Sequence, residues 1–309
     1  MAKPLVEEIL TPVGARGEQR RVCAVILLAG GAGTRAFAQQ SGRPVFQMPV
    51  TSTETVLGIW HSQVRRLIEN AQFAGVSMII AGGERPQTTA HWDSPRVEHL
   101  EDPQELRGTG GVLHDITAGY PDDAHVLVAS AATLLMEPLE RVVGQLVSCG
   151  SDAALCADEA GTPGSLMLIR TRSLRSISAV GFVDLKEQAM PGIAAGNSVA
   201  VLRRRTLATA SLRTSVGYLA ALRRFHSLRN NSHLPLAAAG TSEFAEHWKP
   251  LFGIVEPGAD VAPDARIHDS VVLVGAHVGR GATIVRSIVC PGARVGRAAV
   301  IVDQVVTEN

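Results

Sequence analysis

Residues 25–35 read VILLAGGAGTR, and this stretch decides the fold class. Its first four residues are aliphatic, as in a strand that is buried on both faces of a parallel sheet. Glycines follow at once, and then Thr34 and Arg35. Because glycine lets the backbone approach an anion closely, the N–H groups of such a loop can point at phosphate oxygens. The guanidinium of Arg35 could bind the same oxygens. The stretch therefore predicts an α/β domain whose first strand ends in a phosphate-binding loop.

Two ligand classes fit this loop. Gly31, Gly33 and Ala36 satisfy the dinucleotide fingerprint G-x-G-x-x-A, and Glu54 lies about 20 residues further on, where that fold places an acidic residue. However, LLAGGAGTR also closely resembles the signature loop of the sugar-phosphate nucleotidyltransferases, including a Thr-Arg pair that the dinucleotide fingerprint does not require. We favour the second interpretation because the C-terminal part of the chain supports it.

From Glu256 the chain repeats every 17 residues, in the rows EPGADVAPDARIHDSVV, LVGAHVGRGATIVRSIV and CPGARVGRAAVIVDQVV. Glycine, valine and isoleucine fall in the same columns of each row, at Gly258, Gly275 and Gly292, at Val261, Val278 and Val295, and at Ile267, Ile284 and Ile301. The valine and isoleucine columns lie six residues apart, which is the hexapeptide spacing of a parallel β-helix. The repeat predicts stacked coils that share one continuous core.

This repeat resembles the left-handed β-helix found at the C-terminus of many sugar nucleotidyltransferases and in hexapeptide acyltransferases. Acyltransferases use a catalytic histidine, so His268 and His277 are candidates for that role. Three coils are short for that activity, and we interpret both histidines as surface residues. The two resemblances together cover most of residues 22–306 and imply a divergent nucleotidyltransferase, similar to the mannose-1-phosphate guanylyltransferases.

The resemblance implies an α/β, Rossmann-like nucleotide-diphospho-sugar transferase domain of the GT-A type, with a mixed, mostly parallel sheet. We expect this domain over residues 22–229, after an N-terminal extension over 1–21. A linker over 230–253 then leads to a short left-handed β-helix of three coils over 254–309. Apolar patterns within the domain predict a helix over 56–68 and strands over 76–81, 125–129, 153–156 and 163–170.

The resemblance also assigns residues to the ligands. The nucleotide would be bound by the first loop and by a Gly-Thr loop that begins at Gly108, through Leu28, Ala29, Gly30, Gly31, Gly33, Thr34, Arg35, Thr109 and Gly110. The sugar phosphate would be bound by Gly164, Lys186 and Glu187. Arg35 and Arg43 would stabilise charge during catalysis, Arg43 standing where the family has a lysine.

The chain departs from the family at the magnesium site. The two aspartates expected from the resemblance are replaced by Ala132 and Ser211. Magnesium prefers carboxylate and phosphate oxygens, so the ion would have to be carried by the nucleotide or held by another carboxylate, with Asp184 as the candidate. A plain interpretation of Asp184 is the N-cap of a helix.

Three functions remain open. The first is a nucleotidyltransferase that converts a sugar 1-phosphate and a nucleoside triphosphate into a nucleotide sugar and pyrophosphate, in nucleotide-sugar or cell-envelope polysaccharide biosynthesis. The second is a catalytically degenerate regulatory or scaffold subunit that binds a nucleotide or nucleotide sugar. The third is a β-helix acyltransferase with an accessory domain. Between the first two we favour the enzyme slightly, because the first loop is nearly intact, whereas the replacements at Ala132 and Ser211 point to the second function.

Composition and charge restrict the partners. Apolar residues make up 46% of the chain and charged residues 19%, as in a globular protein, and the formal net charge is zero. Bulk charge therefore predicts neither a nucleic-acid nor a membrane partner. We expect a cytoplasmic protein with reduced cysteines, because no apolar leader or membrane-spanning run is present. We also expect self-association, since the end of a β-helix exposes unpaired strand edges.

Overall fold

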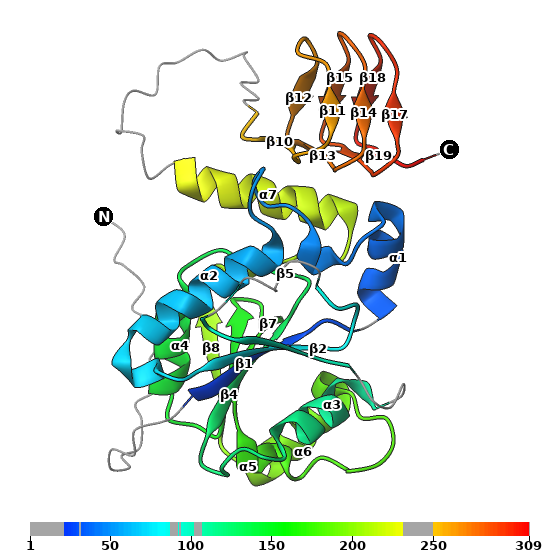
Figure 1. Cartoon of the computed structure of the whole chain (residues 1–309). Helices are drawn as coiled ribbons and strands as arrows, with labels where there is room; N and C mark the ends of the chain where they lie inside the picture. Colours follow the sequence, from blue (N-terminus) through cyan, green and yellow to red (C-terminus); the bar gives the residue numbers. More distant parts are fainter. Residues whose placement is uncertain are drawn as a thin grey trace, which may run out of the picture.

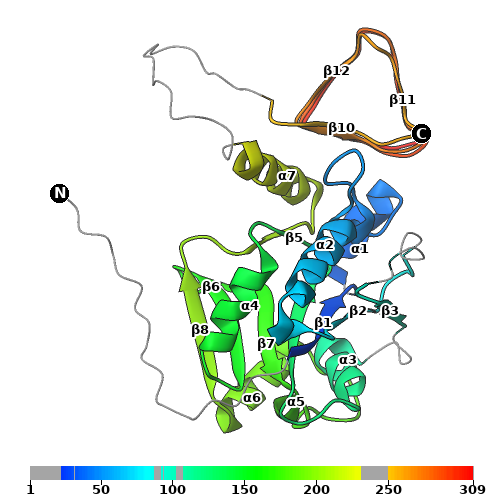
Figure 2. The same cartoon turned by 60° about the vertical axis from the view of Figure 1, so that its left-hand side comes forward.

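The computed structural model describes residues 22–30, 32–86, 92, 94–101, 107–230 and 250–308. It consists of a layered α/β domain and a C-terminal prism of short strands, which is triangular when viewed along its axis (Figures 1 and 2). Both parts of the predicted fold class are thus confirmed. The predicted extension over 1–21 and most of the predicted linker lie outside the described residues.

The α/β domain contains a seven-stranded sheet with the order β3-β2-β1-β4-β7-β6-β8. Its strands are β1 (Val22–Leu28), β2 (Ser77–Ala81), β3 (Val97–Leu100), β4 (His125–Ser130), β6 (Ala153–Asp158), β7 (Pro163–Arg170) and β8 (Val199–Arg204). Only β7 runs antiparallel to its neighbours, so the sheet is mixed and mostly parallel, as predicted. A small antiparallel pair, β5 (Thr133–Leu135) and β9 (Thr209–Ser211), lies beside it.

Helices cover both faces of the sheet. Successive residues of β1 point to opposite faces, and because they are apolar, each face has to be buried under helices. Val25 and Leu27 pack into one core with α1 (Ala32–Ser41), α2 (Val56–Glu69), α4 (Leu139–Ser148) and α7 (Ser215–Asn230). Ala24 and Ile26 pack into the other with α3 (Gly108–Thr117), α5 (Thr171–Leu174) and α6 (Met190–Gly196). Shorter helical turns are η1 (Val45–Gln47), η2 (Ala71–Phe73) and the π-helix η4 (Leu185–Ala189).

The C-terminal prism is a parallel β-helix with three sheets. Their orders are β10-β13-β16-β19, β11-β14-β17 and β12-β15-β18. The strands are β10 (Gly253–Val255), β11 (Asp260–Val261), β12 (Arg266–His268), β13 (Ser270–Val272), β14 (His277–Val278), β15 (Thr283–Val285), β16 (Ile288–Val289), β17 (Arg294–Val295), β18 (Val300–Val302) and β19 (Val305–Val306). Val261 is paired with Val278 and Ile267 with Ile284, so the predicted 17-residue register is confirmed.

One of the three corners of each coil is unusually tight. A single residue, Asp269, separates β12 from β13, and it adopts a φ of 46°. Arg286 and Asp303, the equivalent residues of the next coils, have φ values of 44° and 53°. A left-handed conformation at a non-glycine residue is uncommon. It makes the turn with fewer residues and explains why a coil has 17 residues, one fewer than three hexapeptides.

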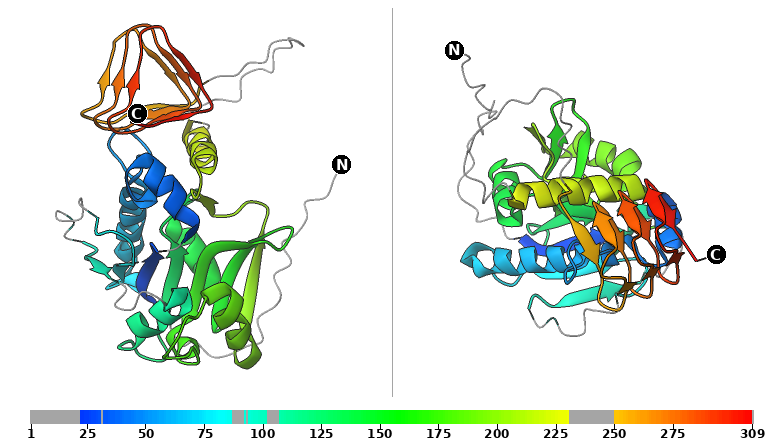
Figure 3. Two further views of the ribbon diagram at one scale, coloured as in Figure 1. Left: turned by 90° about the vertical axis from the view of Figure 1, so that its right-hand side faces the viewer. Right: turned by 90° about the horizontal axis from the view of Figure 1, so that it is seen from above.

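The β-helix shares a core with the α/β domain. Val271 and Leu273 point out of the prism and belong to the same buried cluster as Phe37 of α1 and Tyr218 of α7, whereas Val272 points into the prism. The prism accordingly lies directly over α1 and α7 (Figure 3). In the described part of the chain, no helix combines the length and the apolar character that crossing a membrane requires.

Candidate functional site

The main cavity lies where parallel strands β1 and β4 end side by side. The order of the strands reverses at this point of the sheet: β2 and β3 lie on the far side of β1, whereas β7 lies on the far side of β4. Open α/β sheets bind ligands at the carboxyl ends of the strands at such a switch point. The cavity has a volume of about 310 Å³ and is lined there by Leu28 and Gly30 after β1 and by Ser130 at the end of β4.

Residues assigned separately from the sequence converge on this cavity. Leu28, Gly30, Thr109, Gly164 and Lys186 all line it. They come from the end of β1, the first turn of α3, the start of β7 and η4. Because β7 is antiparallel to β4, its first residues reach the same edge as the last residues of β4. These five predicted nucleotide and sugar contacts therefore share one cavity.

Other predicted nucleotide residues lie outside the cavity lining. The Ala29 amide donates to the carbonyl of Ala81 at the end of β2, at 2.9 Å, so it is already paired. Gly31 lies outside the described residues, and Gly33 and Thr34 fall within α1. Arg35 is also in α1, with an exposed side chain, and not in an open loop. The loop predicted to bind phosphate is thus shorter than the sequence suggested, because the helix begins at Ala32.

Arg43 is held at the junction with the β-helix. Its guanidinium donates to both carboxylate oxygens of Glu256, at 2.7 and 3.0 Å. It does not line the cavity. Its predicted catalytic role thus gains no support from the geometry, which brings this arginine to a partner in the prism and not to the predicted phosphate site.

Asp184 acts as a helix cap, as the plain interpretation predicts. Its Oδ1 accepts hydrogen bonds from the amides of Lys186 and Glu187, at 2.8 and 2.9 Å. Its Oδ2 accepts one from the Thr109 hydroxyl, at 3.3 Å, and this hydroxyl also accepts from the Leu185 amide, at 2.9 Å. Thr109 is thus tied to the first turn of η4. Glu187 is exposed and does not line the cavity.

The Gly-Thr loop is the first turn of α3 and is not a loop before it. Gly110 uses its amide on the carbonyl of Val183, at 2.8 Å, and lies outside the lining. A Cβ at Gly108, which has a φ of 69°, would lie 2.5 Å from the same carbonyl oxygen. The two glycines therefore allow α3 to pack closely against Val183, in the segment that leads into η4.

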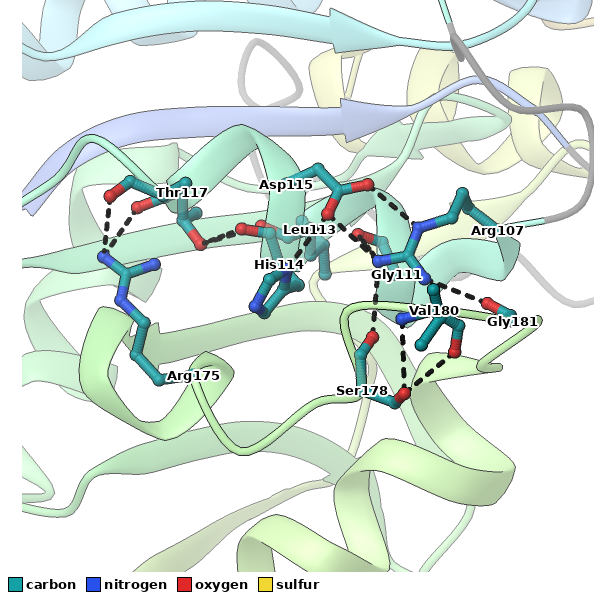
Figure 4. A network of polar contacts seen from close by, with 11 residues as sticks. Arg107, Gly111, Leu113, His114, Asp115, Thr117, Arg175, Ser178, Val180 and Gly181 are labelled. Atoms are coloured by element: carbon teal, nitrogen blue, oxygen red, sulfur yellow. Dashed lines mark hydrogen bonds and ion pairs between the residues drawn. The ribbon is translucent and has the colours of Figure 1, made fainter.

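A buried arginine, Arg107, holds the contact between α3 and the segment before Asp184 in place. Arg107 donates to both oxygens of Asp115, at 2.9 and 3.0 Å, and to the carbonyls of Gly181 and Ser178, at 3.0 and 3.3 Å (Figure 4). The hydrogen bonds from Arg107 lower the pKa of the Asp115 carboxyl. The Arg107 carbonyl also accepts from the Val183 amide, at 2.9 Å. This network joins α3 to the segment before Asp184 and so positions Thr109 and η4. The sequence analysis did not identify it.

Two cations face the cavity, Lys186 and Arg213. Although the Lys186 side chain is largely exposed, burial of its amine lowers the pKa, and the nearby Arg213 lowers it further. Lys186 Nζ lies 3.5 Å from the carbonyl oxygen of Gly164. Among the described residues neither cation forms an ion pair. Sequence reasoning missed Arg213, although it lies two residues after Ser211 in a segment that was compared with the family.

The two positions compared with metal-binding aspartates are adjacent in space. Ala132 precedes β5 and Ser211 ends β9, and these strands pair so that Thr133 faces Ser211. The Leu212 amide donates to the carbonyl of Ala132, at 2.9 Å. Ser211 lines the cavity, while Ala132 is buried. The pairing therefore places Ala132 beside Ser211, which lines the cavity, although Ala132 itself does not.

The residues present do not fit a magnesium ion held by the protein. Ala132 offers no ligand atom, Ser211 offers a neutral hydroxyl, and Asp184 is already hydrogen-bonded through both oxygens. Within the described ranges, no group of three or more histidine, cysteine, aspartate or glutamate side chains could hold a metal ion. Magnesium prefers several hard oxygen ligands, usually carboxylates, which this edge of the cavity lacks.

The two histidines considered for acyl transfer lie on the β-helix and do not line the cavity. His277 faces Asp260 of the preceding coil, with 2.7 Å between Nδ1 and Oδ2, and its side chain is largely exposed. This arrangement is a stacked surface pair between neighbouring coils.

Comparison with known proteins gives little further information. No protein-family model matches the chain, and no curated protein matches it. The crystal structure of HddC from Yersinia pseudotuberculosis aligns with a TM-score of 0.46 and 14% sequence identity, covering 66% of this chain and 100% of that one. At this level of similarity the match does not bear on activity or ligands.

Proposed function

We propose that the cavity binds a nucleotide or nucleotide sugar and that the protein acts mainly as a binding subunit. One observation carries the proposal. Residues in or next to β1, α3, β7 and η4 line the same cavity, and the sequence suggested each of them separately as a nucleotide or sugar contact. Lys186 and Arg213 provide positive charge for the phosphate groups. Gly30, just after β1, and Thr109, in the first turn of α3, would face the nucleoside.

A second candidate is the transferase reaction itself. In this reaction an oxygen of the sugar 1-phosphate attacks the α-phosphorus of a nucleoside triphosphate, a new P–O bond forms, and pyrophosphate leaves. The cavity favours it to the extent that Lys186 and Arg213 could stabilise charge on the transferred group. The replacement of both expected carboxylates argues for a slow reaction, because a misplaced or missing stabilising group commonly lowers the rate by about 100-fold.

Two measurements test these candidates. Isothermal titration calorimetry of the full chain with UDP-glucose, GDP-mannose, dTDP-glucose and the four nucleoside triphosphates should detect binding of at least one compound. The variant Thr109→Val should weaken that binding, because it removes the hydroxyl from the cavity wall. Failure of every compound to bind would refute the proposed function. Release of pyrophosphate from a triphosphate and a sugar 1-phosphate, abolished by the same variant, would establish the second candidate in place of the first.

A further inference from the structure

We infer that the cavity holds its phosphorylated ligand without a protein-bound divalent cation, and that Lys186 and Arg213 supply the positive charge in its place. The inference deepens the proposed function and rests on it. It concerns how the phosphate charge is neutralised, which the choice between binding subunit and transferase leaves open.

The first step of the argument is the chemistry at the edge formed by β5 and β9. The pairing of these strands brings Ala132 and Ser211 together. The two positions at which the family's aspartates are replaced are therefore neighbours in space. Neither residue carries a charge, and the neighbouring Thr133 uses its hydroxyl on the carbonyl of Ser130, at 2.6 Å. A divalent ion at this edge would meet neutral oxygens only, which is a poor environment for magnesium.

The second step is the balance of charge in the cavity lining. Among the described residues, Asp184 is the one carboxylate of the lining, and its two oxygens already cap η4 and accept from Thr109. Lys186 and Arg213 are the cations, and no described carboxylate pairs with either. Besides burial, the charge of Arg213 lowers the pKa of Lys186 more than the charge of Asp184 raises it, so repulsion between the two cations outweighs the attraction to this carboxylate. A phosphate or diphosphate group would relieve that repulsion directly.

The third step is the position of Arg213. It follows Leu212, whose amide is bonded to Ala132, so its guanidinium is carried by the same edge that lacks the carboxylates. An arginine in place of a metal ion is a fixed charge with a planar hydrogen-bonding fork, well suited to phosphate oxygens. The cation and the lost ligands thus occupy one short segment of chain.

The test measures affinity by isothermal titration calorimetry, once in buffer with magnesium chloride and once with EDTA, using the tightest-binding compound among UDP-glucose, GDP-mannose and dTDP-glucose. The inference predicts the same Kd in both buffers. Lys186→Gln and Arg213→Gln should each weaken binding by about tenfold or more in EDTA, since each removes a charge-assisted contact. Arg203→Gln is the matched control, an exposed arginine on β8 outside the cavity, and should leave the Kd unchanged.

Restoring the carboxylates gives the converse test. Ala132→Asp combined with Ser211→Asp should create a dependence on magnesium, with weaker binding in EDTA that magnesium restores. Because Ala132 is buried, Ser211→Asp alone is the second variant, and its thermal melting curve reports whether it is folded.

Each outcome decides a different question. Wild-type binding that requires magnesium overturns this inference and leaves the proposed function standing. Equal affinity of wild type and Arg213→Gln also overturns it. A lack of binding by every compound in both buffers overturns the proposed function and this inference together.

Discussion

Arg43 and Glu256 form a two-pronged ion pair across 213 residues of sequence and join the α/β domain to the β-helix. Glu256 also accepts a hydrogen bond from the Val274 amide in the next coil, at 2.8 Å. The arginine follows α1, and the glutamate follows β10. This pair therefore links the segment just after the first helix to two coils of the prism.

The pair should contribute measurably to stability because both side chains are mostly buried, at 16% and 12% exposure. We expect Arg43→Ala or Glu256→Gln to lower the free energy of unfolding by about 3 kcal/mol, since each leaves a charge or a polar group without its partner. The double variant should cost clearly less than the sum of the two single variants, as measured by urea denaturation. Additive losses would contradict this coupling. The exposed pair Arg205–Glu159 is the control, and its removal should have little effect.

Arg107 should affect both stability and ligand affinity. Its guanidinium is almost fully buried and ties α3 to the carbonyls of Ser178 and Gly181 (Figure 4). Arg107→Gln should destabilise the protein by about 3 kcal/mol, because Asp115 loses the arginine that binds both of its oxygens and the carbonyls lose their donor. Affinity for the calorimetric ligand, measured well below the melting temperature, should fall as well, since η4 loses its support.

Arg175 is a matched control for this variant. It holds the carbonyls of Thr117 and Tyr120 at the far end of α3, at 2.8 and 2.9 Å. Arg175→Gln should lower the melting temperature without changing the Kd. Equal effects of the two variants on affinity would show that Arg107 has a structural role only, and partial recovery of affinity in Arg107→Lys would support its positioning role.

Acid should destabilise the protein partly through Asp152. Burial raises the pKa of this carboxyl, but hydrogen bonds from the amide and hydroxyl of Ser198 and the ion pair with Arg172 lower it more, to about 2 from the ordinary value of 3.8. A lowered folded-state pKa stabilises the protein above pH 4, and this contribution is lost as the pH falls from 4 towards 2. Melting temperatures measured by calorimetry should fall more shallowly over this interval in Asp152→Asn than in wild type. Parallel curves would exclude Asp152 as a source of the acid sensitivity.

The α/β domain and the β-helix should unfold in one transition. Phe252, Ile254 and Val271 of the prism share a buried cluster with Phe37 and Phe225 of the α/β domain, so neither part can lose its structure without exposing the core of the other. Differential scanning calorimetry should give equal calorimetric and van't Hoff enthalpies. Two resolved peaks would show that the parts fold independently.

Much of the fold could be predicted because its signals are local. The aliphatic run before the first glycines, the apolar periodicity of residues 56–68 and the columns of valine and isoleucine each specify an element directly. The register of the β-helix followed from the spacing alone, because residues one period apart must stack. The shared core at the junction was not predicted, since Val271 and Val272 look alike in sequence and only the structure shows which one points outwards.

The candidate site was predicted less well, for two physical reasons. Helix α1 begins at Ala32, earlier than the glycines and Arg35 suggested, and so removes residues from the expected loop. Arg43 could not be assigned from sequence because its partner, Glu256, lies in a different part of the molecule. By contrast, Thr109, Gly164 and Lys186, which the family resemblance pointed to, all line the cavity, and their ligand roles stay predictions.

The tight corner with one left-handed residue in each coil, at Asp269, Arg286 and Asp303, determines where this prism can be engineered. A peptide inserted there would have to replace a turn made by one left-handed residue, and it would push apart strands that are paired with the coils on either side. The turn at Pro263–Asp264 has more residues between β11 and β12 and faces no such restriction. Grafted loops and affinity tags therefore belong at that second corner, where the added residues lengthen the turn and leave the pairing between the strands of neighbouring coils intact.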